Sequence, residues 1–198
     1  MSNYVDDNNG IPTQHDLKLF DNLLDLEIEA NWLNEHLIAL SEMKVVYLFK
    51  NVEITIKYLI HKAYPEIDTR DFFQWNNINS YFKSINIKIS DFNGYTEVNE
   101  LRKVNNNIKH KNIINEEITK IKEFIGERQF TYQNLDDFVI RIKPKVQNFI
   151  KLLGDAIIND LYFFDNNRIK MISDNFKSRM DSQTLHKLTT ELINNPMD

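Results

Sequence analysis

The chain has 198 residues and a formal net charge of -5, with 42% hydrophobic, 27% charged and 12% aromatic side chains. This composition is typical of a soluble globular protein and excludes a disordered chain, which would be poor in apolar residues. A pI near 5.6 argues against a surface coated in basic charge for nonspecific nucleic-acid binding, so any such site must be local.

Several classes of protein are excluded by what the sequence lacks. There are no cysteines, which rules out disulfides, thiolate zinc sites and cysteine nucleophiles. The first residues, MSNYVDDNNGIP, lack the basic start and apolar run of a secretory signal, and no stretch approaches the roughly 18 apolar residues of a membrane span. The expectation is a cytoplasmic protein with no membrane partner.

The first elements along the chain are predicted to be helices. Pro12 and Thr13 predict a helix entry, with Thr13 as the N-cap and Asp16 in the first turn. The apolar positions that follow recur mostly at helical spacing, with some irregularity between Leu24 and Trp32. They are Phe20, Leu23, Leu24, Trp32, Leu33 and Leu37.

A second helix is predicted to begin at Ser41 as its cap and to end near Tyr64, before Pro65. Its apolar stripe is Val45, Leu48, Val52, Ile56, Leu59 and Ile60. A shorter third helix is expected from Asp71 to about Phe82, and its aromatic residues are assigned to packing rather than to base stacking: Phe72, Phe73, Trp75, Tyr81 and Phe82. The alternating run SINIKIS at 84–90 could form a short strand.

The second half of the chain continues the helical pattern. FNG at 92–94 signals a turn, and Thr96 begins a helix that carries LRKVNNNIKHKN. Residues 113–133, broken by Gly126, are left open between some helix and a hairpin. Asn134 opens the last strong element, and Pro144 inside it predicts a kink. Its apolar stripe is Leu135, Phe138, Ile142, Val146, Phe149, Leu153 and Ile157.

The pattern as a whole predicts an all-α protein, an up-and-down helical bundle of four to five main helices. We expect one helical domain over 1–198, with a core at about 14–165 and a weakly helical tail at 166–198. Within that tail, Ser182 to Ile193 predicts one amphipathic helix.

The stretch LRKVNNNIKHKN, residues 101–112, carries the chemistry-bearing candidates. At about 100° per residue, Leu101, Val104 and Ile108 form the buried stripe of a helix, and three polar side chains share the opposite side. These are Lys103, Asn106 and His110, with Arg102 at the edge of that face. A cation, an amide and an imidazole therefore converge on one outward-facing patch.

These side chains suit cleavage of a phosphodiester, although a polar helix face can also be merely solvated. Histidine can take the proton of an RNA 2'-hydroxyl or give one to the leaving oxygen. A neighbouring Arg or Lys stabilises negative charge on phosphorus, and an asparagine can orient the sugar or the phosphate. No metal or cofactor is expected, because the other histidines lack the preceding glutamate of helical di-iron sites and no zinc motif or phosphate loop occurs.

The block GYTEVNELRKVNNNIKH, preceded by LFKNVEITIKYLI and followed by a long helix, resembles the HEPN superfamily of small bacterial helical domains. The basic residue, asparagine and histidine of LRKVNNNIKH carry the likeness, which covers roughly residues 41–165. The resemblance implies a homodimer whose two histidines meet in a metal-independent RNA-cleaving cleft, used in toxicity or antiviral defence. It also implies a nucleotidyltransferase-like antitoxin as a partner.

By this resemblance His110, Arg102, Lys103 and Asn106 are the catalytic candidates, with Lys109, Asn107 and Lys111 as RNA-binding candidates. In the family, four to six residues stand between the Arg and the histidine, whereas seven stand between Arg102 and His110 and six between Lys103, which is not an Arg, and His110. Either Arg102 reaches the site, or Lys103 replaces it without the bidentate fork, or the site is inactive. The competing hypothesis is therefore a noncatalytic helical module for dimerisation and for binding a partner or nucleotide.

Overall fold

The protein is all-α, as predicted. In the computed structural model, the structure describes residues 14–68, 70, 72, 74–110 and 113–194, and these residues form α-helices, short 3₁₀ helices and connecting turns. The chain divides into two compact units, Met1–Leu153 and Gly154–Asp198. None of the described helices is both long and apolar enough to cross a membrane.

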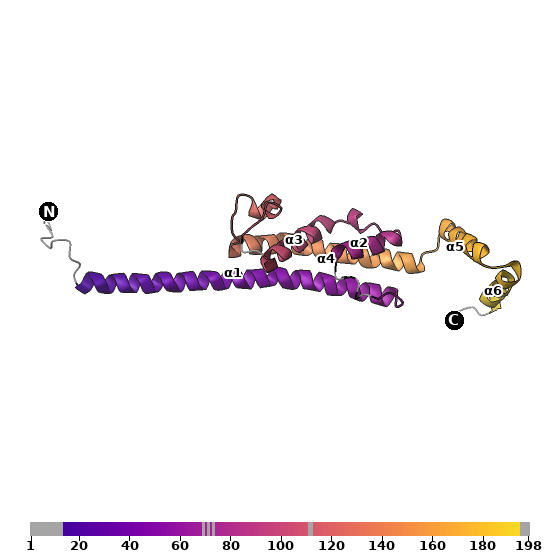
Figure 1. The fold of residues 1–198 in the computed structure, drawn as a ribbon, viewed down its shortest axis with the longest axis horizontal. Coiled ribbons are helices and arrows are strands. Elements are labelled where there is room, and N and C mark those ends of the chain that lie inside the picture. Colours follow the sequence, from indigo (N-terminus) through magenta and orange to yellow (C-terminus); the bar gives the residue numbers. More distant parts are fainter. Residues whose placement is uncertain (1–13, 69, 71, 73, 111–112, 195–198) are drawn as a thin grey trace. The chain divides into compact units, whose positions relative to one another are not determined.

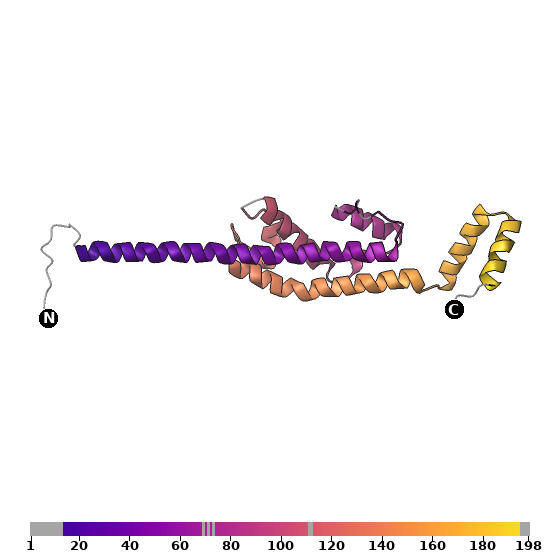
Figure 2. The same cartoon turned by 90° about the horizontal axis from the view of Figure 1, so that it is seen from below.

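The first unit is a helical bundle built on four α-helices, α1 (Gln14–Ala63), α2 (Trp75–Ser84), α3 (Tyr95–His110) and most of α4 (Tyr132–Tyr162). Figures 1 and 2 show α3 and α4 lying along the second half of α1. The fully buried side chains come from all four helices because each helix turns one apolar stripe inward. They include Val45, Ile56, Ile60, Ile78, Phe82, Leu101, Val104, Leu135, Phe138, Ile142 and Phe149.

The helix α1 corrects the prediction of two helices divided at Ser41. It runs unbroken for 50 residues and contains no glycine or proline that would end it. Ser41 is inside the helix and only 2% exposed, and its side chain hydrogen-bonds to Asp136 on α4 instead of capping a helix. The proposed helix entry at Pro12 and Thr13 lies outside the described residues.

The strand proposed at 84–90 is wrong, because α2 ends there in a left-handed turn. Asn86 adopts φ 61°, and the amide of Ile87 donates to the carbonyl of Phe82 at 2.8 Å. The amide of Asn86 donates to Lys83 at 3.1 Å, so the last carbonyls of the helix are satisfied by a C-terminal capping motif. The alternation in SINIKIS instead places Ile87 and Ile89 in the core.

The segment between α3 and α4 forms two short 3₁₀ helices, η3 (Ile118–Lys120) and η4 (Lys122–Phe124), so the hairpin alternative is wrong. Arg141 of α4 fastens this segment to the bundle through ion pairs to Glu123 at 2.7 Å and to Glu100 of α3 at 2.8 Å. Burial raises the pKa of Glu123, but hydrogen bonds from Arg141 and its own backbone amide outweigh burial and leave the pKa below its ordinary value. The segment between α3 and α4 is thereby held against α3.

The helix α4 continues through Pro144, and Figure 2 shows its axis curving rather than straight, as expected where a proline removes a backbone donor. In the second unit, α5 (Asn166–Arg179) begins at Asp165, whose side chain accepts from the amide of Arg168. The predicted tail helix is present as α6 (Ser182–Asn194). Neither α5 nor α6 contains a buried residue.

Candidate functional site

The helix that carries the candidate residues is positioned by the turn in front of it. Gly94 has φ +99°, and a Cβ atom at this position would collide with the carbonyl of Lys145 in α4. Only glycine accepts both that backbone conformation and so close an approach. Because α3 begins at Tyr95, directly after this contact, the glycine determines how closely α3 approaches α4.

Most of the predicted site residues line one cavity. A hollow of about 250 Å³ is bordered by Arg102, Lys103, Asn106, Asn107 and His110 from α3, together with two residues of the following segment, Asn115 and Glu117. Lys109 is exposed and does not border this cavity, and Lys111 lies outside the described residues. The structure therefore brings together the four catalytic candidates and one of the three RNA-binding candidates.

His110 is the last residue of α3 and is exposed. Among the residues that the structure describes, its imidazole has no hydrogen-bond or ion-pair partner. Asn106 stands one turn before it on the same side of the helix, since residues i and i+4 are neighbours on a helix surface. The imidazole is thus accessible to a bound molecule.

The two cations differ in their surroundings. Arg102 donates from Nε and Nη2 to Oδ1 of Asn99, at 3.2 Å and 2.9 Å, which leaves Nη1 with no acceptor in the described part of the chain. Lys103 forms an ion pair with Glu117, Nζ to Oε2 3.4 Å, and its side chain is 33% exposed. The charge of Lys103 is therefore partly neutralised, whereas Arg102 is oriented and keeps donors available.

Asn107 proves to be mainly a structural residue. It is 3% exposed, and its Nδ2 donates to the carbonyl of Ile113 at 3.4 Å. This hydrogen bond ties the beginning of the segment between α3 and α4 to α3. Its buried Oδ1 has no partner among the described residues. The companion Asn105 is 1% exposed and donates from Nδ2 to Oδ1 of Asn106 at 3.2 Å, which orients the Asn106 amide.

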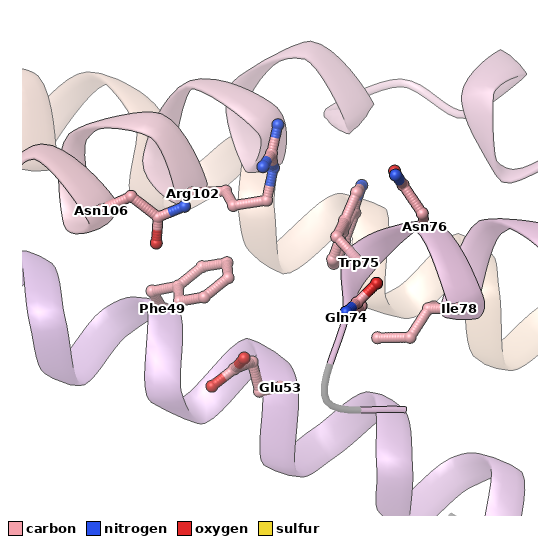
Figure 3. Close-up of a pocket in the computed structure, with 8 residues that line it drawn as sticks. All are labelled: Phe49, Glu53, Gln74, Trp75, Asn76, Ile78, Arg102 and Asn106. Carbon is pink, nitrogen blue, oxygen red and sulfur yellow. The ribbon is translucent and has the colours of Figure 1, made fainter. Parts of the chain in front are cut away.

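A second cavity, of about 310 Å³, shares Arg102 and Asn106 with the first. Figure 3 shows the Arg102 side chain extending along α3 on the side of Trp75 and Asn76, with Phe49 and Glu53 of α1 below. The indole Nε1 of Trp75 is buried and without a hydrogen-bond partner among the described residues. The lining residues are Phe49, Glu53, Gln74, Trp75, Asn76, Ile78, Arg102 and Asn106.

The sequence did not identify this second cavity. The helical spacing of Trp75 and its aromatic neighbours predicts packing, and Trp75 does pack, since it is only 9% exposed. An indole N–H that ends buried without a partner depends on three-dimensional surroundings and leaves no signal in the spacing of residues. The pairing of Lys103 with Glu117 was also missed, because Glu117 lies in the segment whose structure the sequence left open.

The chemistry available is that of an imidazole, a guanidinium, an ammonium and an amide around a small polar hollow. Within the described residues no group of three or more His, Asp or Glu side chains is arranged to hold a metal ion. No family model matches this chain, and no curated protein and no solved structure matches it.

Proposed function

We propose that this chain is a HEPN-like, metal-independent endoribonuclease that acts as a toxin or phage-defence effector. The single observation that carries the proposal is the cavity bordered by His110, Arg102, Lys103 and Asn106. Four side chain types suited to phosphodiester cleavage meet there, and the histidine is accessible and unpaired among the described residues.

In the proposed reaction, the 2'-oxygen of a ribose attacks the adjacent phosphorus as His110 takes its proton. The bond from phosphorus to the 5'-oxygen breaks, leaving a 2',3'-cyclic phosphate on one fragment. The 5'-oxygen leaves as a hydroxyl after receiving a proton, and in a homodimer that proton comes from the His110 of a second copy. Arg102 stabilises the negative charge that develops on the phosphoryl oxygens.

The second cavity supports this proposal because it shares the lining residues Arg102 and Asn106 with the first. Its amides and its carboxylate offer donors and acceptors to the edge of a nucleobase. The nucleotide next to the cleaved bond would occupy this cavity while its phosphate contacts Arg102.

One observation favours a second candidate, a noncatalytic helical module that uses the same surface to bind a partner or a nucleotide. The Lys103 ammonium is already paired with Glu117, and the Arg102 guanidinium is held by Asn99. An acidic residue beside the candidate cation weakens attraction for RNA phosphates. In this alternative the surface recognises a ligand and leaves RNA intact.

The test is incubation of the purified protein with single-stranded RNA in EDTA, comparing wild type with His110→Ala. We expect fragments that end in 2',3'-cyclic phosphate, and a loss of about 100-fold or more in rate for His110→Ala. His186→Ala, in the exposed helix α6, is the matched control and should cleave as wild type does.

Cleavage that is absent in wild type, or equal in His110→Ala, rejects the enzyme. The binding alternative then expects His110→Ala to weaken RNA or partner affinity while RNA stays whole. Inhibition of cleavage by a nucleotidyltransferase-like protein encoded beside this chain would identify the proposed antitoxin.

A further inference from the structure

The first half of α1 packs against nothing in the part of its unit that the structure describes. From Gln14 to Leu40 every residue is exposed except the half-buried Ile38. Figures 1 and 2 both show this half of the helix extending beyond the other helices of the unit. Such a contiguous exposure of large apolar side chains marks an interaction surface in a soluble protein.

Seven of these residues form one regular seam. Their spacing alternates between four and three residues over three heptads, which is the a and d pattern of a coiled coil. In this register Leu23 occupies an a position and Leu26 a d position. The seam contains no charged residue, and its leucines are between 43% and 62% exposed. The seam residues are Leu19, Leu23, Leu26, Ala30, Leu33, Leu37 and Leu40.

The other exposed apolar residues of this half do not form a competing seam. Phe20, Leu24, Ile28 and Trp32 step by four, so they sweep about 120° around the helix from first to last. A straight partner cannot follow that sweep. The heptad seam drifts by only about 20° per heptad, which a left-handed supercoil absorbs.

The end of the seam coincides with the start of the bundle core. Leu40 is 56% exposed, and the next residue, Ser41, is 2% exposed against α4. The two halves of α1 therefore present different faces, one to the bundle of its own chain and one to something outside it. The exposed seam therefore ends at Leu40, and the part of α1 that packs in the bundle begins at Ser41.

The charges beside the seam fit a second copy in parallel orientation. The flanking e and g positions from Asn22 to Asn34 carry only two charges, Glu27 and Glu29. In a parallel in-register pair, a g residue faces the e residue of the partner's next heptad, so Asn22 meets Glu27 and Glu29 meets Asn34. Each carboxylate then faces an amide.

An antiparallel pair that packs Leu19 against Leu37 and Leu26 against Ala30 would set each of these glutamates against its own copy. Like charges at e and g positions disfavour a pairing. The remaining charges of the three heptads lie at the outward c and f positions, where they stay in water. These residues are Lys18, Asp21, Asp25 and Glu35.

We propose that residues 19–40 of α1 form a parallel, in-register coiled coil with the same residues of a second copy of this chain. The parallel orientation keeps the two bundles at the same end of the coil and therefore holds two copies of the His110 surface near each other. The proposed dimer does not depend on the proposed nuclease activity, and the two proposals are tested by separate experiments.

The test measures self-association of the full chain by light scattering and by sedimentation velocity over a concentration series. We expect a mass of about twice the 23.6 kDa of one chain. The double variant Leu26→Glu with Leu33→Glu places charge in the seam and should weaken dimerisation about 100-fold or more. Ile28→Glu, at an outward position that is 59% exposed, is the matched control and should remain dimeric.

The orientation of the two helices is tested by introducing single cysteines. Because the natural sequence contains no cysteine, each introduced thiol is the only one in its variant. Leu19→Cys and Leu40→Cys should each form a disulfide with their own copy under oxidation, because parallel seam positions meet themselves. In an antiparallel pair each would be separated from its copy by about 25 Å or more.

Three results overturn the proposal. The first is a wild-type chain that stays monomeric, which would assign the seam to the chain's own C-terminal helices or to another protein. The second is a dimer that the double variant weakens no more than Ile28→Glu does, which assigns dimerisation to another surface. The third is a dimer in which neither cysteine cross-links. Unchanged circular dichroism of the bundle excludes misfolding as the cause of dissociation.

Discussion

Lys103 Nζ lies 3.4 Å from Oε2 of Glu117, so the segment between α3 and α4 supplies an acid to the candidate RNA-cleaving surface. The pair is partly exposed, at 33% for the lysine side chain and 65% for the glutamate. It therefore modulates the charge of the surface more than it stabilises the fold.

Neutralising this acid should strengthen RNA binding. Glu117→Gln removes the charge that competes with phosphate for Lys103, and we expect affinity for single-stranded RNA to rise about two- to tenfold at low salt. Fluorescence anisotropy over a series of salt concentrations measures this, and the variant should show a steeper salt dependence. Glu116→Gln is the control, because Glu116 is exposed and does not border the cavity. An equal gain in both variants would assign the effect to net charge alone.

Removal of each cation should separate their roles. Arg102 lines both cavities and keeps free donors, so Arg102→Ala should reduce cleavage about 100-fold. Lys103 is partly neutralised by Glu117, and Lys103→Ala should reduce cleavage less than about tenfold. Single-turnover rates with the same RNA decide between them. A larger loss for Lys103→Ala would show that the lysine is the residue that meets the phosphate.

Gly94 should be intolerant of any side chain. Gly94→Ala places a methyl group against the carbonyl of Lys145 at a positive φ, and we expect a loss of about 2 kcal/mol or more in unfolding free energy. Gly126 also has a positive φ, +81°, but has open space around it, so Gly126→Ala should cost only about 1 kcal/mol. Urea unfolding compares the two, and equal losses would show that the close contact with α4 is unimportant.

Stability should fall in acid, partly through Asp136. Hydrogen bonds from Lys44 and Ser41 lower its pKa below the ordinary value of 3.8, against a smaller opposing effect of burial. Because the folded pKa is depressed, this contribution is fully present above pH 5 and is lost as the pH falls through the folded pKa.

Asp136→Asn should therefore flatten the decline of the urea midpoint between pH 5 and pH 2. At pH 7 the substitution should cost no more than about 1 kcal/mol, since the pair with Lys44 is partly exposed. The exposed neighbour Asp137 supplies the control variant Asp137→Asn. A midpoint that declines equally steeply in wild type and in Asp136→Asn would contradict this account.

Helical periodicity predicted the all-α class, the buried positions Leu101 and Val104 of α3 and the polar face that bears Asn106 and His110, whereas Ile108, predicted to be buried, is only half-buried. These features depend on residues three and four apart, which become neighbours in any helix. The same local logic placed α6 correctly. It failed at Ser41, where a residue suited to capping lies inside α1 and hydrogen-bonds to Asp136, distant in the sequence.

The alternation of SINIKIS illustrates the same limit. Alternating isoleucines fit a strand, yet the left-handed turn at Asn86 ends α2 and places two of these side chains in a helical core. A pattern of a few residues cannot distinguish such a turn from a strand when no second strand is present to pair with it.

The sequence by itself determined the all-α class and the shared face of Lys103, Asn106 and His110, and it contains the heptad spacing of residues 19–40. Only the tertiary structure decided that Glu117 meets Lys103, that Arg102 borders two cavities, and that the seam is uncovered while the next residue is buried. The physical reason is the separation along the sequence between the residues that determine each feature. Helix faces follow from the 3.6-residue turn, whereas burial and ion pairing depend on which distant segments pack together.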